Sequence, residues 1–299
     1  MPEPARPGLR AAGVMLLACV CFAAMSLSIG VAHRGQADLS STASSAVRSV
    51  VNLAVIVAMA RGQASLLVGD RRMALWIRGV AGALALTTYF ASLARVGIGE
   101  AAFLNATSTF WVAALAPLLL GERSRPLIWV AVLASVVGTA LLAAPRVGEA
   151  DLVGRGLGAI SGVMAAFAYL GVRRASGSNP PQVIVFYFIA ASTVTCALLA
   201  AFTPVVWPRS PDVWFALVLA GLAATGGQLL MTTAYKLGEA APIAALSTAT
   251  PLLTAAAGVW VLHETPDATA RLGMLILATF GVGLPLLDGA LSRERASSR

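Results

Sequence analysis

Charged residues are scarce in this chain. Asp, Glu, Lys and Arg together make up 11% of its 299 residues, whereas apolar residues make up 58%, and the mean hydropathy is +0.83. A soluble domain is typically about half apolar and about a quarter charged, because charged side chains cover its surface in water. So little charge excludes a soluble protein of this size. The composition predicts an integral membrane protein.

The residue types that carry most metal and enzyme chemistry are also scarce. The three cysteines, Cys19, Cys21 and Cys196, lie inside apolar runs without metal-ligand spacing or a disulfide framework, which is typical of small buried side chains. The two histidines, His33 and His263, stand at run ends, and no HExxH, paired-carboxylate or nucleophile motif accompanies them. No GxxxxGK[ST] loop is present, which excludes ATP-driven pumping by this chain alone. No cofactor, metal or catalytic residue is therefore expected.

Lysine is almost absent. Lys236 is the only lysine among 21 basic residues, and the net charge is +8. The arginines are scattered at the ends of apolar runs and form no stripe with interleaved aromatic residues, so nucleic acid is not an expected partner. The expected partners are a lipid bilayer and a small-molecule substrate.

Long apolar runs are what the chain has in abundance. A bilayer core about 30 Å thick needs roughly 20 apolar residues per helix. Ten runs meet this need, at residues 11–32, 41–60, 73–94, 100–120, 126–144, 153–172, 183–203, 212–234, 241–262 and 269–288. Arg6 and Arg10 precede the first run as they would in a signal peptide, but its length and the nine runs that follow favour a retained first span.

The basic residues between the spans predict the orientation. With the N-terminus inside, the inner segments hold thirteen Arg and Lys residues and the outer loops hold six. Positive residues concentrate on the cytoplasmic side of membrane proteins. Both termini are therefore predicted to be cytoplasmic, in a multi-pass protein of the inner membrane.

A late segment of the chain repeats an earlier one. Residues 99–122 read GEAAFLNATSTFWVAALAPLLLGE, and residues 238–264 read GEAAPIAALSTATPLLTAAAGVWVLHE. The terminal glutamates, Glu122 and Glu264, are 142 residues apart, close to half the chain length. Such spacing predicts two repeats, at residues 1–146 and 147–299. Because each repeat has five spans, an odd number, the second enters the membrane in the opposite sense, as in many secondary transporters.

The second copy resembles a known family. Its Gly-Glu-Ala-Ala start, the Ser-Thr-Ala-Thr-Pro-Leu-Leu run from Ser247 to Leu253 and the final Glu264 look like the second repeat of the drug/metabolite transporter superfamily, EamA type. The RGVAG segment at residues 78–82, followed by Tyr89, resembles that family's third span. The resemblance implies an all-α fold of ten transmembrane helices in two inverted repeats, and a transport function.

The first copy departs from this pattern. Thr109 stands where Pro251 stands when the terminal glutamates are aligned, and the proline of the first half, Pro117, lies nearer the exit. Proline removes a helical hydrogen bond, and broken backbone at membrane depth marks hinges and ligand sites. Pro117 and Pro251 are therefore the expected gating positions.

Two arginines lie inside predicted spans, where ionisable groups are costly and usually functional. Arg48 belongs to a polar stripe on one helical face, formed by Ser41, Ser44, Ser45, Arg48 and Asn52. Arg78 leads a similar face with Tyr89, but it lies one to two turns from the cytoplasmic end, where a snorkelling side chain is the alternative. For either arginine, the other alternative is a structural role in which its side chain pairs with the C-terminus of a helix.

Other polar or aromatic side chains inside spans complete the candidate substrate-binding set. Together with the two arginines, the set is Arg48, Asn52, Arg78, Tyr89, Asn105, Trp111, Tyr169, Tyr187, Gln228, Ser247 and Thr250. Ser and Thr in spans also serve simple helix packing, and this is the alternative for each of them. Gly154, Gly158 and Gly162 predict close packing of the sixth span against a neighbour in the same bundle or in a second protomer of a homodimer.

No acidic residue lies in the middle of a span. A proton-coupled exporter of cationic drugs would need such a carboxylate. Guanidinium groups pair well with carboxylates and phosphates, so the substrate expected is anionic or zwitterionic, with amino-acid-like molecules favoured. The leading hypothesis is a secondary transporter of small organic metabolites working by alternating access. The alternatives are an exporter of drugs or excess amino acids and, from other classes, a membrane enzyme acting on lipid-linked substrates or a non-transporting scaffold.

Overall fold

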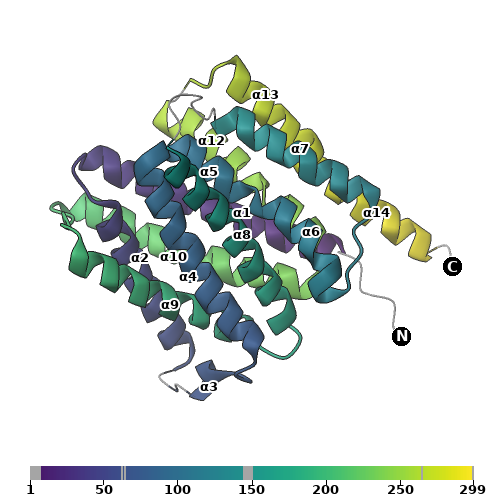
Figure 1. The fold of residues 1–299 in the computed structure, drawn as a ribbon, viewed down its shortest axis with the longest axis horizontal. Coiled ribbons are helices and arrows are strands. Elements are labelled where there is room, and N and C mark those ends of the chain that lie inside the picture. Colours follow the sequence, from purple (N-terminus) through teal and green to yellow (C-terminus); the bar gives the residue numbers. More distant parts are fainter. Residues whose placement is uncertain (1–7, 62, 64, 144–150, 264, 298–299) are drawn as a thin grey trace.

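The computed structural model describes residues 8–61, 63, 65–143, 151–263 and 265–297, which form helices and loops without a β-strand (Figure 1). Ten helices or helix pairs are long and apolar enough to cross a membrane. They are α1 (Leu9–Gly35), α2 (Ser41–Met59), α4 (Met73–Val96), α5 (Ile98–Ala106) with α6 (Ser108–Leu120), α7 (Pro126–Ala143), α8 (Leu152–Ala175), α9 (Pro181–Phe202), α10 (Pro211–Leu237), α11 (Ala240–Leu246) with α12 (Ala249–Leu262), and α13 (Ala268–Ile276) with a π-helical segment (Leu277–Gly283) and α14 (Leu284–Ser297). A short helix, α3 (Ser65–Val68), lies between α2 and α4. The ten predicted spans are confirmed.

Local sequence signals explain where several of these helices begin. Ser40, Asp151, Ser210 and Asp267 each cap a helix by accepting a hydrogen bond from the backbone N–H three residues later. Such caps satisfy donors that the first helical turn leaves without a partner. Proline, which needs no N–H at this position, begins both α9 and α10.

The fourth and ninth spans are each interrupted. The fourth breaks between α5 and α6 at Thr107, and the ninth breaks between α11 and α12 at Ser247 and Thr248. Pro251 follows the second break within the first turn of α12, where its missing N–H leaves no intrahelical hydrogen bond unmade. Pro117, in contrast, lies inside α6 without interrupting it. The first-repeat break is therefore ten residues earlier than the proline at which we expected a hinge.

The two halves have the same arrangement of helices. α4 of the first repeat packs along α8 of the second, and their equivalents in the opposite repeats, α10 and α1, pack along each other in the same way. The fifth and tenth spans, α7 and α13, pack against each other. Both termini lie on one side of the bundle (Figure 1). We call this side the termini end and the opposite side the far end. The layout is the predicted pair of inverted five-helix repeats.

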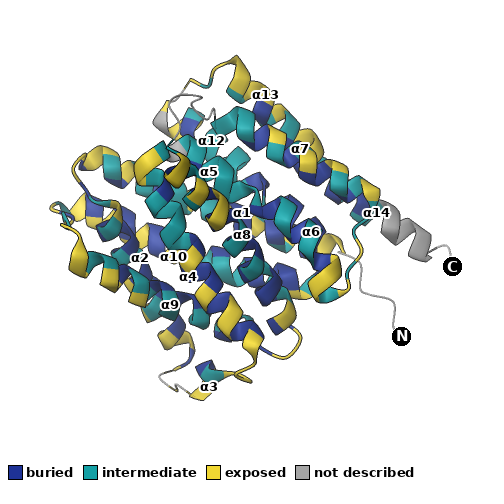
Figure 2. Cartoon of the chain, in the orientation of Figure 1, coloured by how far each residue is buried: buried dark blue, intermediate teal, exposed yellow. Residues whose placement is uncertain are grey.

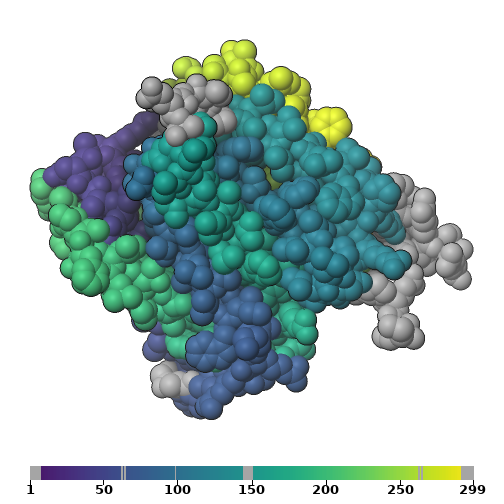
Figure 3. Space-filling view, viewed as in Figure 1, coloured from purple at the N-terminus to yellow at the C-terminus, as the bar shows by residue number. Residues whose placement is uncertain are grey.

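Many exposed residues, in yellow, lie along the helices of the bundle (Figure 2), and a large share of them are apolar. Phe202 and Trp260 are 84% and 82% exposed, and leucines such as Leu118 also face outward. Water would not tolerate so much apolar surface on a soluble protein, whereas lipid does. In the space-filling view the first repeat, in blue and teal, fills much of the front, with α9 in green at one edge and α13 in yellow at the other (Figure 3). The chain is a multi-pass membrane protein.

The glycines of α8 pack against the broken fourth span of the same chain. A Cβ added to Gly162 would stand 2.6 Å from the Leu104 carbonyl oxygen and from Thr107 Oγ1, and one added to Gly158 would meet Leu104 and Ser92. Only glycine allows so close an approach. The neighbour of the glycine pattern therefore lies within the bundle.

Some residues on which the predictions from the sequence relied lie outside the described part of the chain. Glu264, the last residue of the second copy, lies outside them. So do Arg6, Arg146 and Arg299, which contributed to the count of basic residues.

Candidate functional site

Two adjoining chambers occupy the centre of the bundle. The inner chamber, about 250 Å³, is lined by residues of α1, α2, α4, α5, α8, α9 and α10, among them Met25, Arg48, Arg78, Tyr169, Phe188 and Gln228. The second, about 770 Å³, is called the vestibule here and is lined by Ser26, Thr139, Thr250, Pro251 and Thr254, among others. Tyr89 and Asn105 line both chambers. The vestibule extends to Gly99 and Pro266 at the far end.

Arg78 is buried, with only 2% of its surface exposed, and it does not snorkel. Its Nη2 donates to Gln228 Oε1 at 2.8 Å, and its guanidinium carbon lies 4.0 Å from the centre of the Phe188 ring. Its Nε has no hydrogen-bond partner among the described residues. Gly82, one turn along α4, leaves room for the guanidinium, since an added Cβ there would lie 2.5 Å from Nη1. A buried cation with unused donors is expensive unless something pairs with it.

Arg48 approaches the same chamber from α2. Its Nη1 lies 3.9 Å from Met25 Sδ, and no carboxylate within the described ranges forms an ion pair with either Arg48 or Arg78. None of the described residues that line either chamber is acidic. Two guanidinium groups therefore face one small space without a counter-ion from the described chain.

The inner chamber is closed toward the termini end. The rings of Tyr169 and Tyr235 stack there, with centroids 5.9 Å apart and an interplanar angle of 14°. Next to them, Arg173 donates from Nη1 to the Tyr235 carbonyl and from Nε to Glu122 Oε1, at 3.2 and 2.6 Å. The other Glu122 oxygen accepts from the backbone N–H of Ala240 at 2.7 Å. These contacts join the fourth, sixth, eighth and ninth spans.

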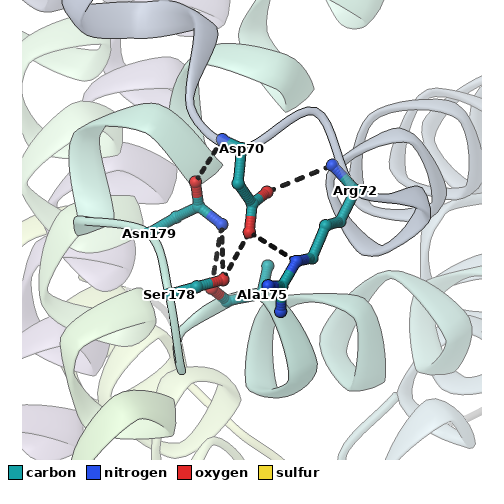
Figure 4. A network of polar contacts seen from close by, with 5 residues as sticks. All are labelled: Asp70, Arg72, Ala175, Ser178 and Asn179. Carbon is teal, nitrogen blue, oxygen red and sulfur yellow. Dashed lines mark hydrogen bonds and ion pairs between the residues drawn. The ribbon is translucent and has the colours of Figure 1, made fainter.

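A second set of contacts joins the repeats at the termini end (Figure 4). Ser178 donates to Asp70 Oδ2 at 2.5 Å, and Asn179 accepts from the Asp70 backbone N–H at 3.1 Å. The side chains of Ser178 first and then Asn179 stabilise the charged carboxylate of Asp70 and lower its pKa below its ordinary value. Gly69, in the left-handed region at φ 61°, makes room for Asn179 and allows the turn that brings Asp70 to it.

Glu239 stands near the Glu122 contacts and forms no ion pair with the described residues. Burial, followed by the nearby charge of Glu122, raises the pKa of the Glu239 carboxyl above its ordinary value. Both effects disfavour the charged form.

The break in the ninth span is held by polar contacts beside the vestibule. Thr248 Oγ1 lies 3.3 Å from Ser135 Oγ of α7, and it also donates to the Ala245 carbonyl at 2.6 Å. Cys19 of α1 approaches the Leu246 carbonyl at 3.6 Å. In the first repeat, Asn105 donates to Ser161 of α8 at 3.2 Å. Side chains of neighbouring helices thus pack against both breaks.

The structure brings most of the candidate residues together. Arg48, Arg78, Tyr89, Asn105, Tyr169 and Gln228 line the inner chamber, and Thr250 and Pro251 line the vestibule. They come from both repeats. The arrangement can hold an anion between the arginines and a larger group in the vestibule.

Four candidates lie elsewhere. The Asn52 side chain contacts the Thr225 hydroxyl of α10 at 2.9 Å, and Trp111 packs against the core with Phe110. Tyr187 donates its hydroxyl to the Val68 carbonyl at 2.9 Å and lines an outward apolar groove. Ser247 donates to the Ala244 carbonyl at 2.6 Å at the helix break. None of the four lines either chamber.

Several lining residues escaped the sequence argument. Phe188 and Met25 look like ordinary apolar residues of a span, and no sequence signal distinguishes them. Ser26 and Thr139 are isolated hydroxyls whose only signal is a polar atom within an apolar run.

Comparisons with known proteins agree with this architecture. A model described as the EamA-like transporter family matches residues 10–144 and 152–284. The chain is 30% identical over 211 residues to the pseudopaline exporter CntI of Pseudomonas aeruginosa, covering 70% of this chain and 74% of that protein. It is 27% identical over 221 residues to a riboflavin transporter of Rhizobium johnstonii, covering 73% and 71%.

A solved crystal structure has the same fold. Its TM-score is 0.80 at 21% sequence identity, over 95% of this chain and 98% of the other. The family model covers most of the chain in two matches, one in each half. The chain therefore belongs to the EamA-like transporter family and is a membrane transporter.

Proposed function

We propose that the protein is a secondary transporter of small anionic or zwitterionic organic metabolites, with amino-acid-like molecules favoured, working by alternating access. The observation that carries this proposal is the pair Arg48 and Arg78, which line one chamber without a carboxylate partner in the described chain. The proposed substrate-binding residues are these two arginines with Tyr89, Asn105, Tyr169, Gln228 and Thr250.

Electrostatics favours an anion over a cation. Two guanidinium groups in a space of low dielectric repel each other and a cationic ligand, and a carboxylate or phosphate relieves that repulsion. The unused Nε donor of Arg78 supports the same conclusion, because a carboxylate accepts from two donors of one guanidinium at once. A zwitterion fits if its acidic group lies between the arginines.

Alternating access is supported by the difference between the two ends. The Glu122 and Arg173 contacts and the stacked tyrosines close the termini end, while the vestibule extends to the far end. In an inverted repeat, the opposite state arises when the two halves exchange conformations. The broken spans, with Thr107 in one and Ser247 in the other, are the proposed hinges.

The remaining assignments rest on the sequence. The excess of basic residues in the segments at the termini end supports cytoplasmic termini in the inner membrane, with repeat boundaries at residues 1–146 and 147–299. The names of the relatives, one an exporter and one a riboflavin transporter, support small organic substrates. Export is the second candidate direction. Family membership indicates transport rather than catalysis, and a homodimer is compatible with the lipid-facing surface.

Uptake by proteoliposomes tests the proposal. Vesicles containing the wild-type protein are expected to take up an anionic or zwitterionic metabolite, from a panel of amino acids, nucleotides and organic acids, at least ten times faster than empty vesicles. Vesicles containing Arg48→Met, which keeps an unbranched side chain but removes the charge, are expected to show less than a tenth of that rate. Uptake equal to that of empty vesicles across the whole panel would refute transport by this chain. Reversal of net flux with an imposed gradient would identify a facilitator, whereas resistance to amino-acid analogues in intact cells would favour export.

A further inference from the structure

The two chambers differ in volume and in charge. The inner chamber, at about 250 Å³, lies below the roughly 300–1,000 Å³ of most small-molecule sites, and it contains Arg48 and Arg78. The vestibule, at about 770 Å³, lies within that range, and none of the described residues that line it is charged. An anionic group fits the first space, and only the second has room for the rest of a metabolite.

Asn105 stands where the chambers meet, and its orientation follows from its neighbours. The Ser161 hydroxyl donates to the Gly158 carbonyl at 2.6 Å, so it can only accept from Asn105 Nδ2, 3.2 Å away. The amide nitrogen of Asn105 is therefore turned toward α8. Its Oδ1 accepts no hydrogen bond from the described residues, and the Tyr89 hydroxyl beside the same chambers also has no such partner there.

The vestibule offers hydroxyls and small apolar groups. Thr250 and Thr254 line it together with Pro251, Ala255 and Val259. A second formal charge on the substrate would find no counter-ion among the described residues of this wall. An uncharged group, either apolar or bearing hydroxyls, would be bound without that cost.

We infer that the site is bipartite and selects organic acids with three features. A compact acidic head binds Arg48 and Arg78 in the inner chamber, a hydrogen-bond donor next to the head binds Asn105 Oδ1, and a large uncharged body occupies the vestibule. Tyr89 and Asn105 are then specificity-determining residues at the junction. The inference rests on the proposed function, because the same two arginines hold the head.

N-acylglycines test this inference, since they share one carboxylate and one amide N–H and differ only in the acyl group. Binding to the purified wild-type protein in detergent is measured by isothermal titration. N-benzoylglycine and N-octanoylglycine are expected to bind at least ten-fold more tightly than N-acetylglycine. A second carboxylate on the benzoyl ring is expected to weaken binding at least ten-fold. Equal affinities across this series would overturn the inference without the use of any variant.

Two variants test the contributions of the junction and the vestibule separately. N-benzoylsarcosine, which lacks the amide N–H, is expected to bind about five-fold more weakly than N-benzoylglycine to wild type. The two ligands should bind to Asn105→Leu with equal affinity. Thr254→Trp, or Ala255→Trp if the first does not fold, is expected to remove the advantage of the long acyl groups and to leave N-acetylglycine binding unchanged. Leu133→Trp, at a lipid-facing position 52% exposed, is the control and is expected to change neither affinity.

Failure of the proposed function gives a different result. If no N-acylglycine binds, or if Arg48→Met binds the series as tightly as wild type, the arginines are not the anion site and both proposals fall. If binding depends on Arg48 but not on the acyl group or on Thr254→Trp, the inference of a bipartite site alone is wrong.

Discussion

The two ends of the broken spans differ in a way that suggests a mechanism. At the termini end α11 packs against α6, and the Glu122 carboxylate accepts from the first N–H of α11 at 2.7 Å. At the far end the vestibule lies between α5 and α12. The same two spans thus touch at one end and are separated at the other. Because they are equivalent elements of an inverted repeat, the opposite arrangement needs no new contact type, only an exchange of roles.

The two ends also differ in how their glutamates are paired. Glu100 lies 2.5 Å from Arg155 at the far end, and Glu122 lies 2.6 Å from Arg173 at the termini end. Both arginines belong to α8. Glu239, the counterpart of Glu100 in the second Gly-Glu-Ala-Ala start, has no ion pair within the described residues. The two repeats therefore share a fold but not the same ion pairs. Glu239 has a charge that can respond to pH.

The largest effect on substrate binding is expected at Arg78, the more deeply buried of the two arginines. Arg78→Met removes a charge-assisted hydrogen bond to substrate, worth about 2 kcal/mol, and should weaken substrate binding roughly thirty-fold. Because wild type holds this cation without a carboxylate, the variant should melt at the same temperature as wild type or above it. Transport kinetics and a thermal melt measure the two effects. Arg95→Met at the far-end surface, where the arginine pairs with Asp151, is the control and should alter transport little. A variant that loses transport and also melts well below wild type would make Arg78 a structural residue.

The next effect concerns the closed end. Glu122→Gln keeps an acceptor for the Ala240 N–H but loses the ion pair with Arg173, so the termini end should open more often. Opening of the termini end is measured through Ala168→Cys, at a position that lines the inner chamber, in a protein whose native cysteines are replaced by alanine. A membrane-impermeant thiol reagent added at the termini side should label it at least five-fold faster in Glu122→Gln than in the parent.

Glu100→Gln is the matched change at the far end and should leave labelling from the termini side unchanged. Equal acceleration by both substitutions would show that the two ends are not distinct gates.

A smaller effect is expected from Glu239, and its sign depends on pH. Its pKa is raised in the folded state, so the stability that its neutral form provides is present at low pH. That stability is lost as the pH rises through the raised pKa. Glu239→Gln mimics the neutral form, and it should raise the melting temperature by about 1 °C at pH 8 and not at all at pH 4. A lower melting temperature for the variant at pH 8 would contradict this assignment.

The smallest effect, of opposite sign, is expected from Asp70. The side chains of Ser178 and then Asn179 lower the pKa of the Asp70 carboxyl, so its contribution is present above the ordinary carboxyl range and lost as the pH falls through the lowered pKa. Asp70→Asn should lower the melting temperature slightly at pH 7, and the difference should vanish in strong acid. Arg71→Gln, next to it in the chain, is the control and should show no such dependence. A pH-independent difference would mean that the charge of Asp70 is not what joins the loops.

Apolar run length predicted the ten spans, because the bilayer imposes one dimension on every helix. It did not predict the break at Thr107, since nothing in the Asn-Ala-Thr-Ser sequence forbids helix, and the close packing of Gly162 against that break arises from the fold. The helix is not interrupted at Pro117, because α6 accommodates this proline on an exposed face.

Periodicity identified polar faces but not the neighbours that they meet. Arg48 and Gln228 face the same chamber from helices 180 residues apart in sequence, which only tertiary packing decides. Tyr187 belongs to an equally plausible pattern, yet its hydroxyl reaches the Val68 carbonyl at the edge of the bundle. Asn52 extends the polar stripe of Arg48 but contacts Thr225 of α10 instead of the cavity.

A thermal-shift screen tests the central claim most directly. Purified wild-type protein and Arg48→Ala are melted with amino acids, nucleotides, sulfonium metabolites and organic cations. The account predicts that an anionic or zwitterionic ligand stabilises wild type and that Arg48→Ala loses this stabilisation. Stabilisation by cations alone, unchanged in Arg48→Ala, would contradict an anion site built on the two arginines.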